Sequence, residues 1–183
     1  MADEEYIEEL VYEYLDELSG REGAYMFTAD EESHDIIHRK VLGFMTNKLG
    51  QQGVCITLET EKDFLNLIRQ IDSTKVHFIN KYNETQKQTP VKVTLLEDEE
   101  SIEEITGKLT EVLASSPNKF VIIKSLDRLF HKNALDDIAT FTEEIIESLN
   151  KTGISVITIA RGQQLTSNLV TKTKHNYDKT VHI

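Results

Sequence analysis

The stretch NKFVIIKSLDRLF, residues 118–130, places a charged side chain at the end of an apolar run. Lys119 leads into Phe120–Ile123, which has the pattern of a short buried strand, and Lys124 follows directly. In open α/β sheets, the carboxyl ends of the strands form the crevice where ligands bind. The sequence therefore predicts that Lys124 lies in that crevice.

Apolar runs alternate with amphipathic stretches along most of the chain. This alternation is typical of a largely parallel sheet with helices on both faces and right-handed crossovers. We therefore predict a three-layer α/β/α domain. The expected strands cover residues 23–28, 53–59, 76–80, 120–123, 153–160 and 179–183, with 91–96 as a further strand or an edge extension and a polar loop over 81–89. The expected helices cover residues 3–18, 30–49, 61–72, 101–114, 134–150 and 164–172.

The length of 183 residues suits a single domain. We expect residues 1–20 to form an acidic helix and residues 21–183 to form the α/β domain. The single cysteine, Cys55, excludes an internal disulfide and is interpreted as an inert core residue. The sequence shows neither a signal pattern nor an apolar run of about 18 residues, so we expect a cytoplasmic protein without membrane contact.

The net charge of −12 is concentrated at one end of the chain. Residues 1–35 contain 13 Asp and Glu against one base, Arg21, and the remaining residues contain 19 acids and 19 bases. A partner of the acidic end would carry a basic surface. Residues 161–183 carry four Lys and Arg against one Asp. This short run is a weak signal for nucleic acid, which is not an expected partner. The two oppositely charged ends could meet within one chain or between copies.

Residues 3–18 have the pattern of an amphipathic helix, because apolar residues recur every three or four positions between carboxylates. Two alternatives remain open for this helix. It packs on its own domain, or it docks on another protein. The apolar positions are Ile7, Leu10, Val11, Tyr14, Leu15 and Leu18.

Four segments resemble the RecA-like core of KaiC-type ATPases: QQGVCITLETEKDFLNLI (51–68), KFVIIKSLDRL (119–129), ESLNKTGISVITIA (147–160) and DKTVHI (178–183). Their order and spacing match that core over residues 23–183, and archaeal proteins built on the same core are similar as well. The resemblance implies a RecA-like topology. It indicates fold more strongly than activity.

The phosphate-binding loop of such ATPases has no counterpart in this sequence. A Walker A motif needs a glycine-rich turn and a Lys-Ser/Thr pair, whereas the turn TADEES, residues 28–33, contains neither glycine nor lysine. Its acids Asp30, Glu31 and Glu32 are expected to satisfy the first helix amides in place of a phosphate. The pair Gly107-Lys108 lies inside a predicted helix and is not a Walker motif. We therefore predict a degenerate ATPase core that does not bind Mg-ATP.

The resemblance also places the family's metal-holding aspartate at the position of Lys124. A lysine repels a divalent cation. We hypothesise that Lys124 replaces the lost metal by pairing with Asp30, Glu31 or Glu59, and the alternative is that its side chain reaches solvent. Glu59 matches the first of the family's paired catalytic glutamates, but Thr60 replaces the second.

Two further residues are expected at the same edge of the sheet. Asp127 lies just past the strand that ends at Lys124, where a loop salt bridge is commoner than a shifted metal ligand. Arg161 ends the run ITIAR and is placed to meet an anion. The candidate crevice residues are thus Asp30, Glu31, Glu59, Lys124, Asp127 and Arg161.

The pentapeptide HDIIH, residues 34–38, suggests a different chemistry. Two histidines four apart lie on one helix face, as in zinc proteases, with Asp35 at the position of the general base. His34 and His38 are therefore weak metal candidates for a metal-dependent hydrolase. The third ligand would have to be His77, His131, His175 or His182, and nothing in the sequence selects among them.

The sequence as a whole favours a non-enzymatic RecA/KaiC-like domain that needs no cofactor and acts as a protein-interaction or regulatory subunit. A protein partner or assembly into a homo-oligomer is expected. The main alternative is a domain that binds a small ligand near Glu59, Lys124 and Arg161.

Overall fold

A computed structural model describes residues 3–17, 22–58, 60–82, 91–162 and 164–183. Within these ranges, seven strands form one sheet in the order β4-β3-β2-β5-β6-β1-β7. All neighbouring strands are parallel. The strands are β1 Ala24–Ala29, β2 Gly53–Thr57, β3 Val76–Asn80, β4 Lys92–Leu95, β5 Phe120–Lys124, β6 Ser155–Arg161 and β7 Lys179–His182.

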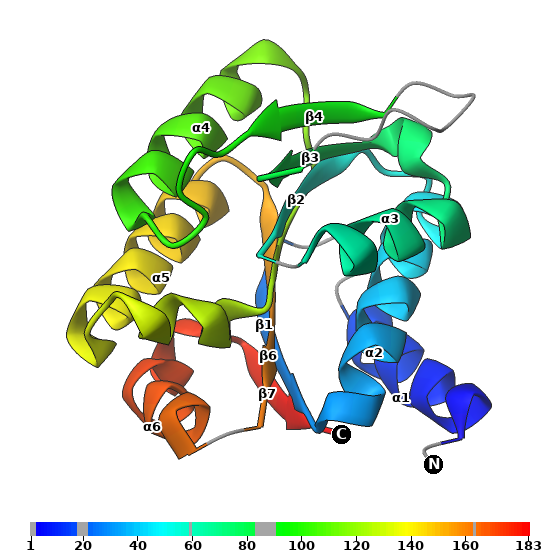
Figure 1. Ribbon diagram of the computed structural model, residues 1–183. Coiled ribbons are helices and arrows are strands. Elements are labelled where there is room, and N and C mark those ends of the chain that lie inside the picture. The colour runs from blue at the N-terminus through cyan, green and yellow to red at the C-terminus, as the bar shows by residue number, and fades with distance from the viewer. Residues whose placement is uncertain (1–2, 18–21, 59, 83–90, 163) are drawn as a thin grey trace.

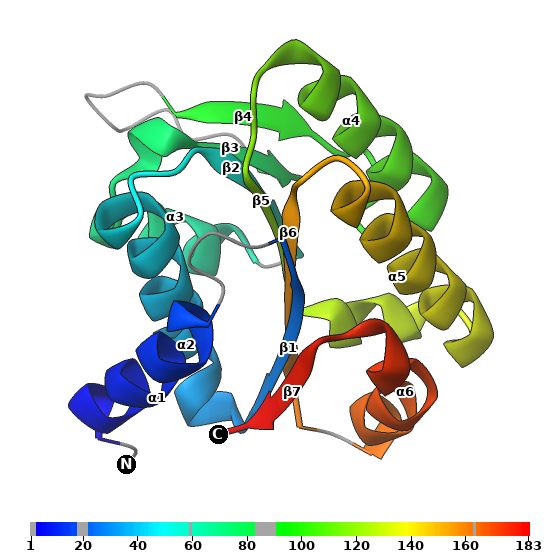
Figure 2. The ribbon, with the colours of Figure 1, turned by 180° about the vertical axis from the view of Figure 1, so that it is seen from behind.

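Helices cover both faces of this sheet (Figures 1 and 2). One face carries the first three helices, and the other carries the last three. This arrangement confirms the predicted three-layer α/β/α class. The helices are α1 Glu4–Asp16, α2 Glu31–Gly43, α3 Glu61–Gln70, α4 Ile102–Ser115, α5 Leu135–Asn150 and α6 Gln164–Thr173. No helix in the described ranges has both the length and the apolar character needed to cross a membrane.

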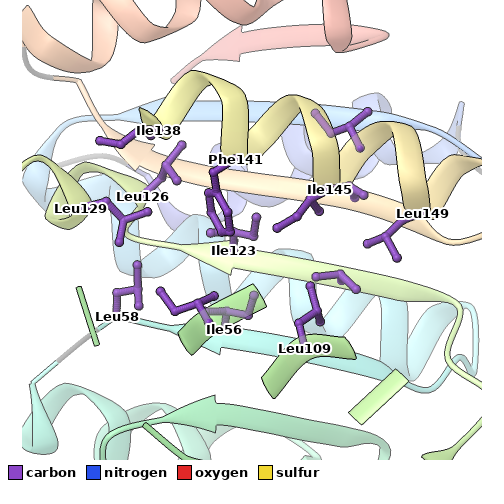
Figure 3. Packing of buried hydrophobic residues seen from close by; sticks show 14 of the residues in the cluster. Ile56, Leu58, Leu109, Ile123, Leu126, Leu129, Ile138, Phe141, Ile145 and Leu149 are labelled. Carbon is purple, nitrogen blue, oxygen red and sulfur yellow. The ribbon is translucent and has the colours of Figure 1, made fainter. Parts of the chain in front are cut away.

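Each face of the sheet has its own apolar core, because alternate residues of every central strand point to opposite sides. Val121 and Ile123 of β5 join the core under α4 and α5, part of which is shown in Figure 3. Phe120 and Ile122 of the same strand join the core under α1, α2 and α3. Lys124 continues the second series, so its side chain lies on the α2 side.

Helix α1 packs on its own domain. Its apolar stripe, Ile7, Val11 and Leu15, is fully buried in the core beneath α2. Two ion pairs tie its carboxyl-terminal end to the rest of the chain, Lys48–Asp16 at 2.7 Å and Lys179–Glu17 at 3.0 Å. The structure thus selects the first alternative for this helix, and the acidic and basic ends of the chain meet within one molecule.

Most predicted elements agree with the structure to within two residues, and two differences are informative. The helix expected over 30–49 divides into α2 and a π-helical segment, Phe44–Lys48, where Thr46 Oγ1 donates to the Leu42 carbonyl oxygen at 2.7 Å and competes with the backbone. A 3₁₀ segment, Leu126–His131, follows β5 and was not predicted. The segment 91–96 forms the edge strand β4. Most of the loop expected over 81–89 lies outside the described residues.

Candidate functional site

The carboxyl ends of the central strands gather the predicted crevice residues on the α2 side of the sheet. Lys124, the last residue of β5, pairs in register with Thr57 of β2 and Ile159 of β6. Arg161, the last residue of β6, pairs with Ala29 of β1. The amino-terminal end of α2 follows β1 directly and lies over the same edge. We call the resulting group the edge cluster; it comprises Asp30, Glu31, Asp35, Lys124, Asp127 and Arg161.

Lys124 pairs with Asp35. Its side chain is 3% exposed, and Nζ lies 2.8 Å from Asp35 Oδ1. The side chain therefore does not reach solvent, and the hypothesis of a carboxylate partner is correct in kind. It is wrong for Asp30 and Glu31, whose carboxylates bind elsewhere. The third named partner, Glu59, lies outside the described residues.

The path of α2 explains why Asp35 takes this place. The helix starts at the end of β1 and crosses over β6, so residues one turn into the helix lie closer to β5 than its first residues do. Glu31 and Asp35 are four residues apart and share one helix face. Glu31 consequently meets Arg161 of β6, whereas Asp35 meets Lys124 of β5. The place where α2 crosses the sheet cannot be predicted from the spacing of residues along the chain or from the pattern of their charges.

The Asp35 carboxyl is strongly acidic. His34 Nδ1 lies 3.5 Å from Asp35 Oδ1, at the limit of a hydrogen bond, and Lys124 makes the shorter contact. His34 and the Lys124 ammonium together hold the pKa of Asp35 well below its usual range, against a smaller opposing effect of burial. Asp35 therefore stays ionised and neutralises the buried ammonium at every physiological pH.

Arg161 is held by two carboxylates. Its Nε lies 2.9 Å from Glu31 Oε2, and its Nη1 lies 3.4 Å from Asp127 Oδ2. Its backbone N–H also donates to Asp127 Oδ1 at 3.1 Å. Asp127 is therefore a salt-bridge residue that fixes the end of β6. An incoming anion would have to compete with both carboxylates for this guanidinium.

Asp30 caps α2 and leaves little space between strand and helix. β1 ends at Ala29 and α2 begins at Glu31, so a single residue connects them. Asp30 Oδ1 accepts from the Ser33 N–H at 2.8 Å, and this bond lowers the pKa of Asp30. The helix amide that a bound phosphate would use is thus satisfied by the chain itself.

Ser125 connects the edge cluster to the 3₁₀ segment in a strained conformation. Its φ of 62° and ψ of 45° lie in the left-handed region, where a non-glycine residue costs roughly 1–2 kcal/mol. Its side chain is buried, and Arg161 Nη1 donates to its Oγ at 3.4 Å. Sequence reasoning missed this residue because serine is not a typical residue for that conformation.

The HDIIH histidines lie in the core behind the edge cluster. His34 and His38 are fully buried, and His38 Nε2 lies 3.3 Å from Cys55 Sγ. Burial, and secondarily the charge of Lys124, lowers the pKa of His38 well below its usual value, so its imidazole is neutral. Cys55 is therefore a buried residue with a polar neighbour.

The structure provides no third ligand for these histidines among the residues it describes, where no group of three or more His, Cys, Asp and Glu side chains could hold a metal. Three of the expected third ligands have other neighbours. His77 Nε2 lies 2.8 Å from Thr94 Oγ1, His131 Nδ1 lies 2.9 Å from Glu100 Oε1, and His182 Nδ1 lies 3.0 Å from Thr28 Oγ1.

A small polar cavity of about 60 Å³ lies beside the Lys124–Asp35 pair. Arg39 of α2 and Asp63, Asn66 and Gln70 of α3 line it as well. Small-molecule sites typically measure about 300–1,000 Å³. This cavity is therefore smaller than the sites that usually hold a small molecule.

The chain is similar to known proteins in its structure but not in its sequence. No protein-family model matches the sequence, and no curated protein matches it. Among solved structures, a KaiC-like protein of the hyperthermophilic archaeon Pyrococcus horikoshii is similar, with a TM-score of 0.60 over 87% of this chain and 70% of that chain. The chain has a KaiC-like RecA fold. Because sequence identity is only 11%, the likeness concerns the RecA fold alone and carries no activity with it.

Sequence reasoning identified most of the edge cluster of this RecA fold and the salt bridge of Asp127, but not the partner of Lys124. Asp30, Glu31, Lys124, Asp127 and Arg161 all lie at the predicted edge. Asp35 was considered only as a general base between two histidines. Its position four residues after Glu31 was the signal that could have revealed it, since that spacing puts both carboxylates on one helix face.

Proposed function

We propose that this chain is a non-catalytic RecA/KaiC-like domain that acts as a protein-interaction or regulatory subunit and does not bind Mg-ATP in the usual way. The observation that supports this most strongly is the pair between Lys124 and Asp35 at 2.8 Å. It puts a buried ammonium, already neutralised, where the resemblance to KaiC-type ATPases would place the metal-holding aspartate.

A polyphosphate would also meet repulsion at the start of α2. Asp30 occupies the amide of Ser33, and Glu31 and Asp127 lie at the Arg161 guanidinium. Each like-charge pair at about 4 Å costs on the order of 1 kcal/mol in bulk water and roughly 4 kcal/mol at an effective dielectric of 20. Several such pairs together would outweigh what one arginine contributes.

The proposed role follows from what the fold retains. RecA-like domains commonly assemble side by side, and by analogy such a domain assembles with a protein partner or with copies of itself. The alternative of a small-ligand domain receives support from the polar cavity beside Lys124. Its volume of about 60 Å³ restricts it to a very small ligand, so we favour the interaction role.

Calorimetry with nucleotides tests the non-catalytic part of the proposal. Mg-ATP, Mg-ADP and magnesium-free ATP are titrated into the full chain, and inorganic triphosphate serves as a matched probe of the phosphates alone. We expect no saturable heat for any of them. A ligand at 100 times its Kd would stabilise the fold by about 2.7 kcal/mol, so a thermal-shift measurement gives an independent readout. Stoichiometric uptake of Mg-ATP would refute the proposal.

A further inference from the structure

A groove of about 240 Å³ runs between α4 and α5, on the opposite face of the sheet from the edge cluster. Its floor is apolar and consists of Leu109 and Leu113 from α4 with Phe141, Ile145 and Leu149 from α5. Figure 3 shows Leu109, Phe141, Ile145 and Leu149 within the buried core on this face. The packing partners of the two helices explain the gap, because α4 lies on β2 and β3 whereas α5 lies on β6 and α6.

The size and lining of the groove suit side chains better than a whole small molecule. Its volume is below the range of about 300–1,000 Å³ that small-molecule sites occupy. The floor offers no charged group, and the polar residues Thr106, Thr110 and Ser148 are confined to the rim. Apolar anchors on one face of a helix enter grooves of this kind at positions i, i+3, i+4 and i+7.

The surroundings of the groove are strongly acidic. Together α4 and α5 carry eight Asp and Glu residues against one base, Lys108. Two of the eight, Asp136 and Glu147, pair with Lys172 and Lys151 from outside these helices, which leaves an excess of carboxylates. Glu144 lines the groove itself, and Glu103 and Glu143 are exposed on the same two helices. This concentration is hidden in the overall charge, because acids and bases balance over residues 36–183. Such a rim attracts a basic partner and fixes its orientation.

The negative charge of the acidic rim also excludes several possible occupants of the groove. Two copies that met through their grooves would bring carboxylates against carboxylates. Nucleic acid and anionic membranes carry the same sign of charge as the rim and would be repelled. The helix α1 of this chain cannot serve, since its apolar stripe is buried on the other face of the sheet.

We infer that the α4–α5 groove binds an amphipathic helix of a partner protein, whose apolar side chains enter the groove and whose flanking lysines or arginines face the acidic rim. This inference rests on the proposed function and names the surface and the kind of partner. It moves the interaction surface from α1, where the charge of the sequence alone would put it, to the opposite face of the domain.

A designed peptide provides the probe. It is a fluorescent helix of about 18 residues with leucines at i, i+3, i+4 and i+7 and lysines on both flanks. A matched peptide replaces the lysines with glutamates, and a second replaces the leucines with alanines. Binding to the full chain is measured by fluorescence polarisation. We expect saturable binding of the lysine peptide and at least about tenfold weaker binding of both matched peptides.

Paired substitutions locate the binding surface. Ser148→Arg fills the groove, whereas Thr140→Arg makes the same change in charge on an exposed part of α5 that does not line the groove. We expect S148R to weaken the lysine peptide at least about tenfold and T140R to change its affinity less than about twofold. Circular dichroism and a thermal melt verify that both variants fold. Hydrogen exchange should show peptide protection in α4 and α5.

Several results would overturn the inference. These are equal affinity for the lysine and glutamate peptides, equal affinity of the S148R and T140R variants, or protection on α1. If sedimentation shows a dimer that S148R dissociates, the occupant of the groove is a second copy of the chain. If the free chain binds neutral vesicles and S148R abolishes that binding, the occupant is a membrane. None of these results bears on nucleotide binding, so calorimetry and the peptide assay can fail separately.

Discussion

The edge cluster and the α4–α5 groove differ in how their charged side chains are placed. At the edge cluster, the charged side chains pair with one another, as in Lys124–Asp35 and Arg161–Glu31. Along the α4–α5 groove, Glu144 is exposed beside an apolar floor. The difference teaches that charged groups at one edge of a domain can satisfy one another, while carboxylates on another surface of the same domain stay exposed.

The largest expected effect comes from removing one charge of the edge cluster. Asp35→Ala leaves the buried Lys124 ammonium without its carboxylate neighbour at 2.8 Å. Removing one partner of a buried pair typically costs about 3–5 kcal/mol. Because the Asp35 side chain is 60% exposed, water replaces part of the interaction, and we expect a loss of about 2 kcal/mol of unfolding free energy.

Urea denaturation measures this loss, and a second substitution provides its control. Lys124→Met removes the buried charge and keeps a side chain of similar length. The double variant with Asp35→Ala should recover most of the stability that the single Asp35→Ala variant loses. If the double variant is as unstable as the single one, the carboxylate does not act through the ammonium.

The pH dependence of the unfolding free energy tests the same face of the sheet, and the expected effect is smaller. Burial lowers the pKa of His38 below its ordinary 6.5, so the unfolded chain binds a proton there that the folded chain excludes. The contribution of His38 to the unfolding free energy is therefore fully present above pH 6.5. It is lost as the pH decreases, by up to about 1.4 kcal/mol per pH unit for this one group. Asp35, whose pKa is also lowered, adds a further loss below about pH 4.

Denaturation curves between pH 8 and pH 3 measure this slope. A His38→Leu variant should have a flatter curve between pH 6.5 and pH 5, because it removes the proton that the unfolded chain gains. An unchanged slope in the variant would show that His38 is not the buried group that titrates.

The smallest expected effect comes from removing exposed carboxylates of α5, on the face that carries the groove. Glu143→Gln and Glu144→Gln replace exposed carboxylates with amides of the same shape, and surface changes of this kind usually stay within about 0.5 kcal/mol. Thermal unfolding of the single and double variants measures the change. A destabilisation of more than about 1 kcal/mol would mean that these carboxylates support the fold, which would weaken their proposed role toward a partner.

The sequence predicted the layers and the strands well because each buried strand is a short apolar run of its own. It also placed Lys124, Arg161 and Asp127 correctly, since the end of a parallel strand determines the edge at which a side chain lies. The partner of Lys124 could not be predicted, because it depends on the angle at which α2 crosses the sheet.

The α4–α5 groove was invisible in the sequence for a similar reason. Both helices have ordinary amphipathic patterns, and each packs its apolar stripe on the sheet. The groove arises from the distance between them, which the strand order determines, since α4 lies over β2 and β3 and α5 lies over β6. Local patterns carry no information about that distance.

The position of β1 has a consequence for how the chain matures on the ribosome. This strand, Ala24–Ala29, lies between β6 and β7, which are synthesised more than a hundred residues later. Until then it has no neighbour in the sheet, and α1 cannot complete its contact with Lys179. Such distant pairing slows folding. The earliest part of the domain to be made therefore becomes ordered late.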